Sequence, residues 1–65
     1  MYDNAELNER LVIIKHSNLD DAVILDENYK HLMRETPNPE EQQQLLVLHR
    51  IVERRVKELS QTHNA

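Results

Sequence analysis

RETPNPEEQQQ, residues 34–44, is the stretch of sequence that divides the chain into its structural parts. Pro37 lacks a backbone donor and disfavours helical geometry at the residue before it, so a preceding helix should end near Glu35. Asn38 followed by Pro39 has the pattern of a helix N-cap with proline at the first helical position. The sequence therefore predicts that a second helix begins at residue 39.

The residues after this break keep a helical pattern to about residue 61. Their apolar residues recur at spacings of three and four, which draws one continuous stripe along a helix. The stripe consists of Leu45, Leu48, Val52, Val56 and Leu59, and it is widened by Leu46, Val47 and Ile51. We therefore predict a helix over residues 39–61, with residues 62–65 as a frayed tail.

The residues before the break follow the same spacing from about residue 4 to residue 35, which predicts one long helix with Asn18 inside its apolar stripe. Such a helix would be ~48 Å long against ~35 Å for the second, so its first turns would lack a partner. A break near residues 17–18 is the alternative, because Ser17 followed by Asp20 resembles an N-cap pattern. Asn18 would then mark a kink or a helix start. In a continuous helix it would instead fix register and partner number.

A third arrangement replaces part of this helix with two strands, residues 11–14 and 22–25, around the Ser17–Asp21 loop. Their β-branched residues favour strands. The order of a short strand, a loop, the sequence AVIL and a tyrosine-containing helix resembles the Phd/YefM antitoxins over less than half of the chain. This resemblance implies an antitoxin-like regulator, although the chain lacks a turn glycine and the family's N-terminal helical segment. The unbroken helical spacing favours an all-α fold instead.

The small size of the chain predicts self-association. A domain of ~60 residues buries only ~60 % of the surface of its unfolded chain, and small domains compensate with disulfides, metals or oligomerisation. The 65 residues include no cysteine, which excludes disulfides. We predict an antiparallel helical hairpin that forms a homodimer, most simply an antiparallel four-helix bundle. The predicted interface consists of the apolar residues beside the stripes, Leu19, Val23, Leu46, Val47 and Ile51.

Catalytic and metal-dependent functions find little support in the sequence. The absence of glycine excludes P-loops, dinucleotide-binding fingerprints and nucleophile elbows. His49–Glu53 and Glu27–His31 have the i,i+4 spacing of helical metal ligands, and His31 could approach His49 across the hairpin. Such pairs arise readily in a highly charged chain. We therefore predict a non-enzymatic protein with no catalytic residue, cofactor or metal.

The charge pattern limits the partners of the chain. With 12 acidic and 8 basic residues the net charge is −4, which disfavours general binding to phosphate backbones. No apolar run approaches the ~20 residues that span a bilayer, and the polar start MYDNAELNER is unlike a signal peptide. A cytoplasmic adaptor or regulator that binds a protein partner of unknown identity is the predicted function. The alternative is nucleic-acid binding in a Rop-like bundle by the basic residues Arg50, Arg54, Arg55 and Lys57.

Overall fold

The computed structural model describes residues 2–63, which contain three α-helices and no strand. The helices are α1 (Asn4–Lys15), α2 (Leu19–Glu35) and α3 (Pro39–His63), and they cover 87 % of the described residues. The predicted all-α class is confirmed. The two predicted strands are wrong, because residues 11–14 and 22–25 lie inside helices, and the resemblance to the antitoxins loses the strand order on which it rested.

The predicted continuous helix over residues 4–35 is wrong, and the alternative break near residues 17–18 is confirmed. Asn18 is the N-cap of α2, where its Oδ1 accepts a hydrogen bond from the backbone N–H of Asp21 at 2.8 Å. Ser17 does not cap α2 as its sequence pattern suggested. Its buried hydroxyl instead donates to the carbonyl of Ile14 at 2.6 Å, and this carbonyl also accepts the backbone N–H of Ser17 at 3.2 Å.

The link between α2 and α3 follows the sequence pattern closely. Asn38 caps α3, because its Oδ1 accepts hydrogen bonds from the backbone N–H groups of Glu40 and Glu41 at 2.9 and 3.3 Å. Gln42 reaches back from the first turn of α3 and donates to the carbonyl of Thr36 at 2.7 Å. α2 ends at Glu35 and α3 begins at residue 39, as predicted. The helix α3 continues through residues 62 and 63 of the predicted frayed tail, and residues 64–65 lie outside the described range.

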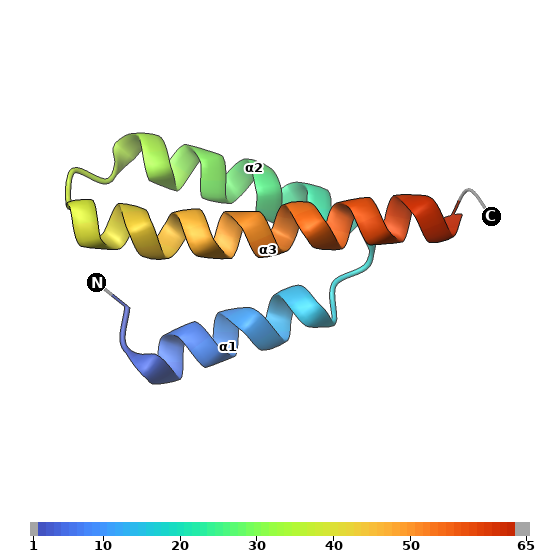
Figure 1. Ribbon diagram of the computed structural model, residues 1–65, viewed down its shortest axis with the longest axis horizontal. Helices are drawn as coiled ribbons and strands as arrows, with labels where there is room; N and C mark the ends of the chain where they lie inside the picture. The colour runs from blue at the N-terminus through green and yellow to red at the C-terminus, as the bar shows by residue number, and fades with distance from the viewer. Residues whose placement is uncertain (1, 64–65) are drawn as a thin grey trace.

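The three helices lie in a thin layer with α3 in the middle (Figure 1). α1 and α3 run in the same direction and α2 runs opposite to them, with α2 packed on α3 more extensively than α1 is. The Cα atoms extend over 40 × 23 × 14 Å. Their radius of gyration is 12.2 Å, whereas a compact chain of this length has ~10.7 Å. The layer therefore leaves much of each helix open on its broad faces.

Contacts at both ends of α1 hold this helix against α3. Near its N-terminus, the backbone N–H and carbonyl of Tyr2 exchange hydrogen bonds of 3.0 and 3.1 Å with the amide of Gln44. Beyond its C-terminus, Arg55 donates from Nε and Nη2 to the carbonyl of Ser17 at 3.3 and 2.9 Å. Ile14 is the buried residue of α1, and the half-buried Leu7 of α1 packs against the same core. The buried apolar residues are Ile14, Ala22, Tyr29, Leu45, Leu48 and Val52.

Candidate functional site

Large apolar side chains are unusually exposed in this structure. Three of them are consecutive on α1, where Leu11, Val12 and Ile13 are 37, 54 and 52 % exposed. Successive residues of a helix point about 100° apart, so this turn is apolar in every direction while only Ile14 faces the core. A helix that is apolar all round is normally covered on all sides. The other exposed large apolar residues are Val23, Ile24, Leu46, Val47 and Ile51.

One groove gathers several of these side chains between α1 and α3. This α1–α3 groove has a volume of about 440 Å³ and an apolar floor formed by Leu11, Ile14 and Ile51. Val47 lies one turn before Ile51 on α3 and extends the apolar strip along the helix. The rim is charged and carries both signs. Its residues are Lys15, Arg54, Arg55 and Glu58.

The five residues of the predicted interface lie at several places on the molecule. Ile51 lines the α1–α3 groove, and Val47 lies beside it. Leu46 lines a different depression, between the C-terminal end of α2 and the start of α3. Val23 lines a third groove, between α2 and α3, and Leu19 is half-buried. The structure therefore brings Ile51 together with Leu11 of α1, which the sequence had not placed with it.

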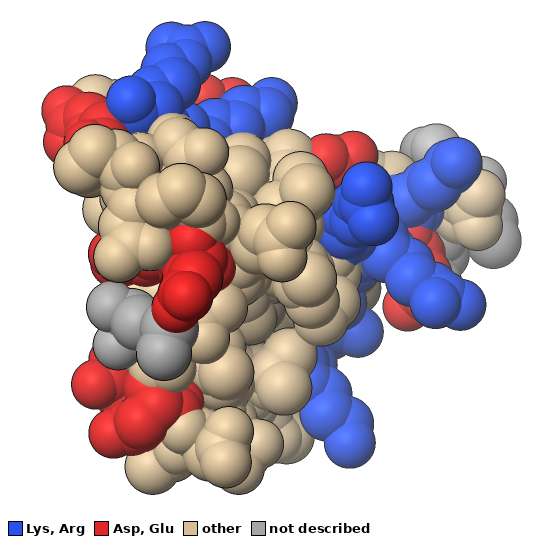
Figure 2. Space-filling view, turned by 60° about the vertical axis from the view of Figure 1, so that its left-hand side comes forward, with Lys and Arg blue, Asp and Glu red and all other residues tan. Residues whose placement is uncertain are grey.

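The four basic residues of α3 also divide into two kinds. Arg50 and Lys57 are exposed, and the side chain of Arg54 is 83 % exposed with an i,i+4 ion pair of 3.5 Å to Glu58. Arg55 is half-buried, and its two hydrogen bonds to the Ser17 carbonyl give it a structural role. Figure 2 shows basic side chains gathered around the end of the molecule that carries the C-terminus. Three of the four residues in the predicted nucleic-acid set, Arg50, Arg54 and Lys57, are therefore surface cations.

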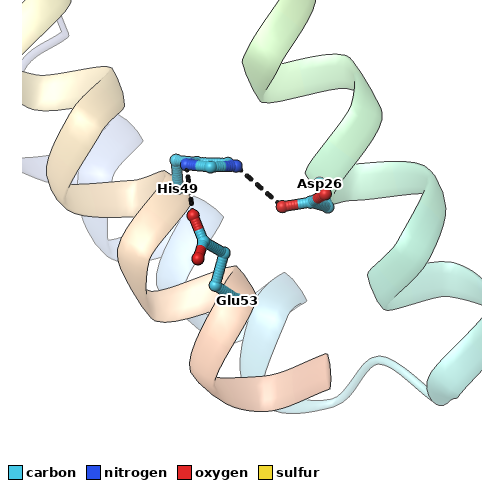
Figure 3. A group of neighbouring side chains, drawn as sticks. All are labelled: Asp26, His49 and Glu53. Carbon is cyan, nitrogen blue, oxygen red and sulfur yellow. Dashed lines mark ion pairs between the residues drawn. The ribbon is translucent and has the colours of Figure 1, made fainter. Parts of the chain in front are cut away.

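A polar cluster bridges α2 and α3 on another side of α3 (Figure 3). We call Asp26, His49 and Glu53 the His49 cluster. The imidazole of His49 lies between two carboxylates, with Nε2 at 2.7 Å from Asp26 Oδ1 and Nδ1 at 2.9 Å from Glu53 Oε1. His49 is only 7 % exposed, whereas the Glu53 side chain is 59 % exposed. The cluster thus has a buried centre and one solvent-facing carboxylate.

The short contact between His49 Nε2 and Asp26 Oδ1 joins two buried atoms of different helices. The contact is an ion pair when His49 is protonated, and neither Nε2 nor Oδ1 has another hydrogen-bond partner among the described residues. The other oxygen, Oδ2, is 3.1 Å from Lys30 Nζ, and this interaction with Asp26 raises the pKa of Lys30. A neutral imidazole has only one N–H donor, so this buried pair is satisfied only when the proton is on Nε2, when the ring is charged, or when a cation lies between the two atoms.

Sequence spacing identified only part of this cluster. The His49–Glu53 pair was readable because i,i+4 residues are neighbours on any helix. No sequence pattern indicated that Asp26 belongs to this cluster, because its approach to His49 depends on how α2 packs against α3. His31, which was considered as a partner of His49, instead forms an exposed pair with Glu35 at 3.1 Å. Among the described residues, the His49 cluster is the one group of three metal-ligand side chains with all ligand atoms within 4.8 Å of one another.

Comparisons of the chain with protein-family models, with curated proteins and with solved structures found no match. Within the described residues, no helix has both the length and the apolar character needed to cross a membrane. A function for this chain therefore has to be argued from the α1–α3 groove and the His49 cluster themselves.

Proposed function

We propose that the chain is a small non-enzymatic helical adaptor or regulator that acts through self-association and protein–protein contact, with a homodimer as its basic unit. The observation that carries the proposal is the apolar face of the α1–α3 groove. Leu11 and Ile51 are each 37 % exposed and line the groove with the core residue Ile14, and Val47, one turn before Ile51 on α3, is 55 % exposed. Contiguous apolar surface of this kind is typical of interaction sites.

A second copy of the chain suits this face in shape and in charge. The chain exposes 4959 Å², whereas a compact monomer of its mass exposes ~4400 Å². A two-fold dimer presents the same face from both copies. The rim cations Lys15 and Arg54 of one copy can then lie opposite Glu58 of the other. With α1 and α3 contributed by each copy, four helices would meet at the interface, in line with the predicted four-helix bundle.

The size of the apolar contribution sets the concentration at which the dimer should form. Fully burying one such side chain contributes roughly 1.5–3 kcal/mol, and the three named residues are about half exposed, so both copies together gain roughly 4–8 kcal/mol. The loss of translational and rotational freedom offsets a large part of that gain. Even without that loss, roughly 4–8 kcal/mol corresponds to a dissociation constant between about 1 mM and about 1 µM, so we expect a weak dimer with a constant in the upper micromolar to millimolar range.

Sedimentation velocity from about 1 µM to about 1 mM tests this proposal. The wild-type chain should shift from monomer to dimer across the range, and Ile51→Glu should keep the chain monomeric because a charge cannot be buried unpaired in the groove. Ile24→Glu is the matched control, since Ile24 is 58 % exposed and lies between α1 and α2. Loss of the dimer in Ile24→Glu but not in Ile51→Glu would show that the interface lies on a different face and not at the α1–α3 groove.

Nucleic-acid binding is the second candidate function, and one observation favours it. Lys15 from α1 lines the same groove as Arg54, which adds a cation to the exposed basic residues of α3. The net charge of −4 works against it. The double variant Arg50→Gln with Arg54→Gln should abolish retention of RNA or DNA at low salt, whereas Lys30→Gln with Arg34→Gln removes equal charge elsewhere and should not. Unchanged retention in the first variant, or no retention by the wild type, rules out this function.

A further inference from the structure

His49 is held in a position where its two nitrogens cannot both be satisfied by the protein when the ring is neutral. A neutral imidazole has one N–H donor and one nitrogen lone pair. With the proton on Nδ1, next to Glu53 Oε1 at 2.9 Å, Nε2 presents its lone pair to Asp26 Oδ1 at 2.7 Å. Two electron-rich atoms then face each other inside a site where His49 is 7 % exposed. A cation between them would remove the repulsion and satisfy both.

We propose that His49 Nε2 and Asp26 Oδ1 bind a divalent transition-metal ion of the Zn²⁺ class and thereby join α3 to α2. A nitrogen and a carboxylate oxygen are ligands that suit Zn²⁺, Co²⁺ and Ni²⁺. Zinc bonds of about 2.1 Å to each atom in tetrahedral geometry require a nitrogen–oxygen separation of ~3.4 Å. The observed 2.7 Å therefore has to widen by well under 1 Å. Rotation of the Asp26 side chain, which is half-buried, is enough.

Glu53 has a different part in the site. Histidines that bind metals commonly donate the N–H of their other nitrogen to a carboxylate, which fixes the tautomer and the ring orientation. Glu53 lies one turn after His49 on α3, with its carboxylate on the Nδ1 side of the ring (Figure 3). It is therefore a positioning residue for the metal ligand. Asp26 and Glu53 also line a groove of about 370 Å³ between α2 and α3, which would give the ion a path from solvent to the Asp26 side of the site.

Lys30 opposes metal binding and makes the site recognisable by experiment. Its Nζ lies 3.1 Å from Asp26 Oδ2, so its positive charge sits close to the proposed ion. Like charges at this separation repel, and the effect is reduced but not removed by the exposure of Lys30. Removal of this charge should strengthen metal binding. Removal of a positive charge elsewhere on the surface should not strengthen metal binding.

The two ligands come from different helices, so the bound ion should stabilise the packing of α2 on α3. An ion that binds the folded state and not the unfolded state raises the thermal unfolding midpoint as its concentration rises. This inference does not rest on self-association, because the His49 cluster lies on the α2 side of α3 and the proposed dimer face lies on the α1 side. Failure of one proposal therefore leaves the other intact.

The experiment is a titration of the full chain, without an affinity tag, with Zn²⁺ and Co²⁺. Calorimetry measures affinity, and circular dichroism measures the unfolding midpoint, with Mg²⁺ as the probe that should have no effect. His49→Gln and Asp26→Asn should each weaken Zn²⁺ binding at least tenfold. The matched control is His31→Gln, because His31 and Glu35 form an exposed i,i+4 pair without a carboxylate from a second helix. This control should keep the wild-type affinity.

Two further variants test the positioning and charge arguments. Glu53→Ala should weaken binding about 10- to 100-fold, while Glu53→Gln keeps an oxygen acceptor for Nδ1 and should restore most of it. Lys30→Gln should strengthen binding. Circular dichroism of every variant without metal checks that the variant is folded. If His49→Gln does not fold, Asp26→Asn tests the loss of a metal ligand in its place. An unchanged midpoint with Zn²⁺, an equal shift with Mg²⁺, or an equal loss of affinity in His31→Gln and His49→Gln would overturn the metal site.

Discussion

Arg55 provides the sharpest test of the three-helix arrangement, because one side chain connects the turn after α1 to α3. It donates from Nε and Nη2 to the Ser17 carbonyl at 3.3 and 2.9 Å, and Ser17 is only 5 % exposed. Arg55→Met removes both donors but keeps an apolar stem of similar length. The substitution should therefore release the α1–α2 turn from α3 without leaving a cavity.

The expected loss of stability follows from the kind of bond removed. Hydrogen bonds that involve a charged group contribute about 1.5–3 kcal/mol, and both bonds of Arg55 share one acceptor, so we expect a loss of about 2 kcal/mol. Arg54→Met is the control, because it removes the same charge from the neighbouring residue. Arg54 has an 83 % exposed side chain and a 3.5 Å pair with Glu58 along the helix. Exposed i,i+4 pairs contribute only ~0.3–0.5 kcal/mol.

Chemical and thermal unfolding followed by circular dichroism measures the difference at one fixed protein concentration, since self-association would shift both curves. One kcal/mol lowers the unfolding midpoint of a chain of this size by roughly 4–8 °C. Arg55→Met should therefore unfold about 10 °C below the wild type, and Arg54→Met within about 3 °C of it. Equal effects of the two substitutions would refute the structural role of Arg55 and the position of α1.

Two further substitutions test the core and the helix break. Ile14→Ala should lower the free energy of unfolding by about 2–5 kcal/mol because Ile14 is 1 % exposed. Ile13→Ala is the control and should cost far less, because Ile13 is 52 % exposed. Similar losses in the two variants would mean that α1 turns a different face toward α3. Asn18→Ala should cost about 1 kcal/mol through loss of the N-cap bond to Asp21, measured by the same unfolding assay. No loss in Asn18→Ala would favour a helix that continues through residue 18.

The link and the bounds of α3 could be predicted because their causes are local. Proline acts on its own residue and the one before it, and the Asn38 cap acts on N–H groups two and three residues away. These interactions need no knowledge of the rest of the chain. The end of α2 and the start of α3 therefore agree with the prediction to the residue.

The break between α1 and α2 was harder, because apolar spacing continues across it and residues 16–18 include no proline or glycine. Local helix propensity alone does not distinguish clearly between a continuous helix over residues 4–35 and a helix broken near residues 17–18. Tertiary contacts decide between them, since the break lets α1 fold back so that Ile14 enters the core and the Ser17 carbonyl meets Arg55. A continuous helix would have left those turns without a partner.

Cross-helix contacts mark the limit of sequence reasoning for the candidate sites. Spacing along α3 identified His49 with Glu53, but the register of α2 against α3 decides that Asp26 is the residue facing Nε2. In the same way, Arg55 looked like a surface cation beside Arg54, and only the path of the α1–α2 turn gives it an acceptor. Neither partner is close in sequence, so no local pattern could have found it.

Self-association through the α1–α3 groove is tested most directly by sedimentation equilibrium of the wild-type chain from the micromolar to the millimolar range. We expect the weight-average mass to rise from one chain toward two as concentration increases, with Ile51→Glu remaining at one chain and Ile24→Glu following the wild type. A wild-type chain that stays folded and keeps the mass of one chain at every concentration would contradict the proposed homodimer.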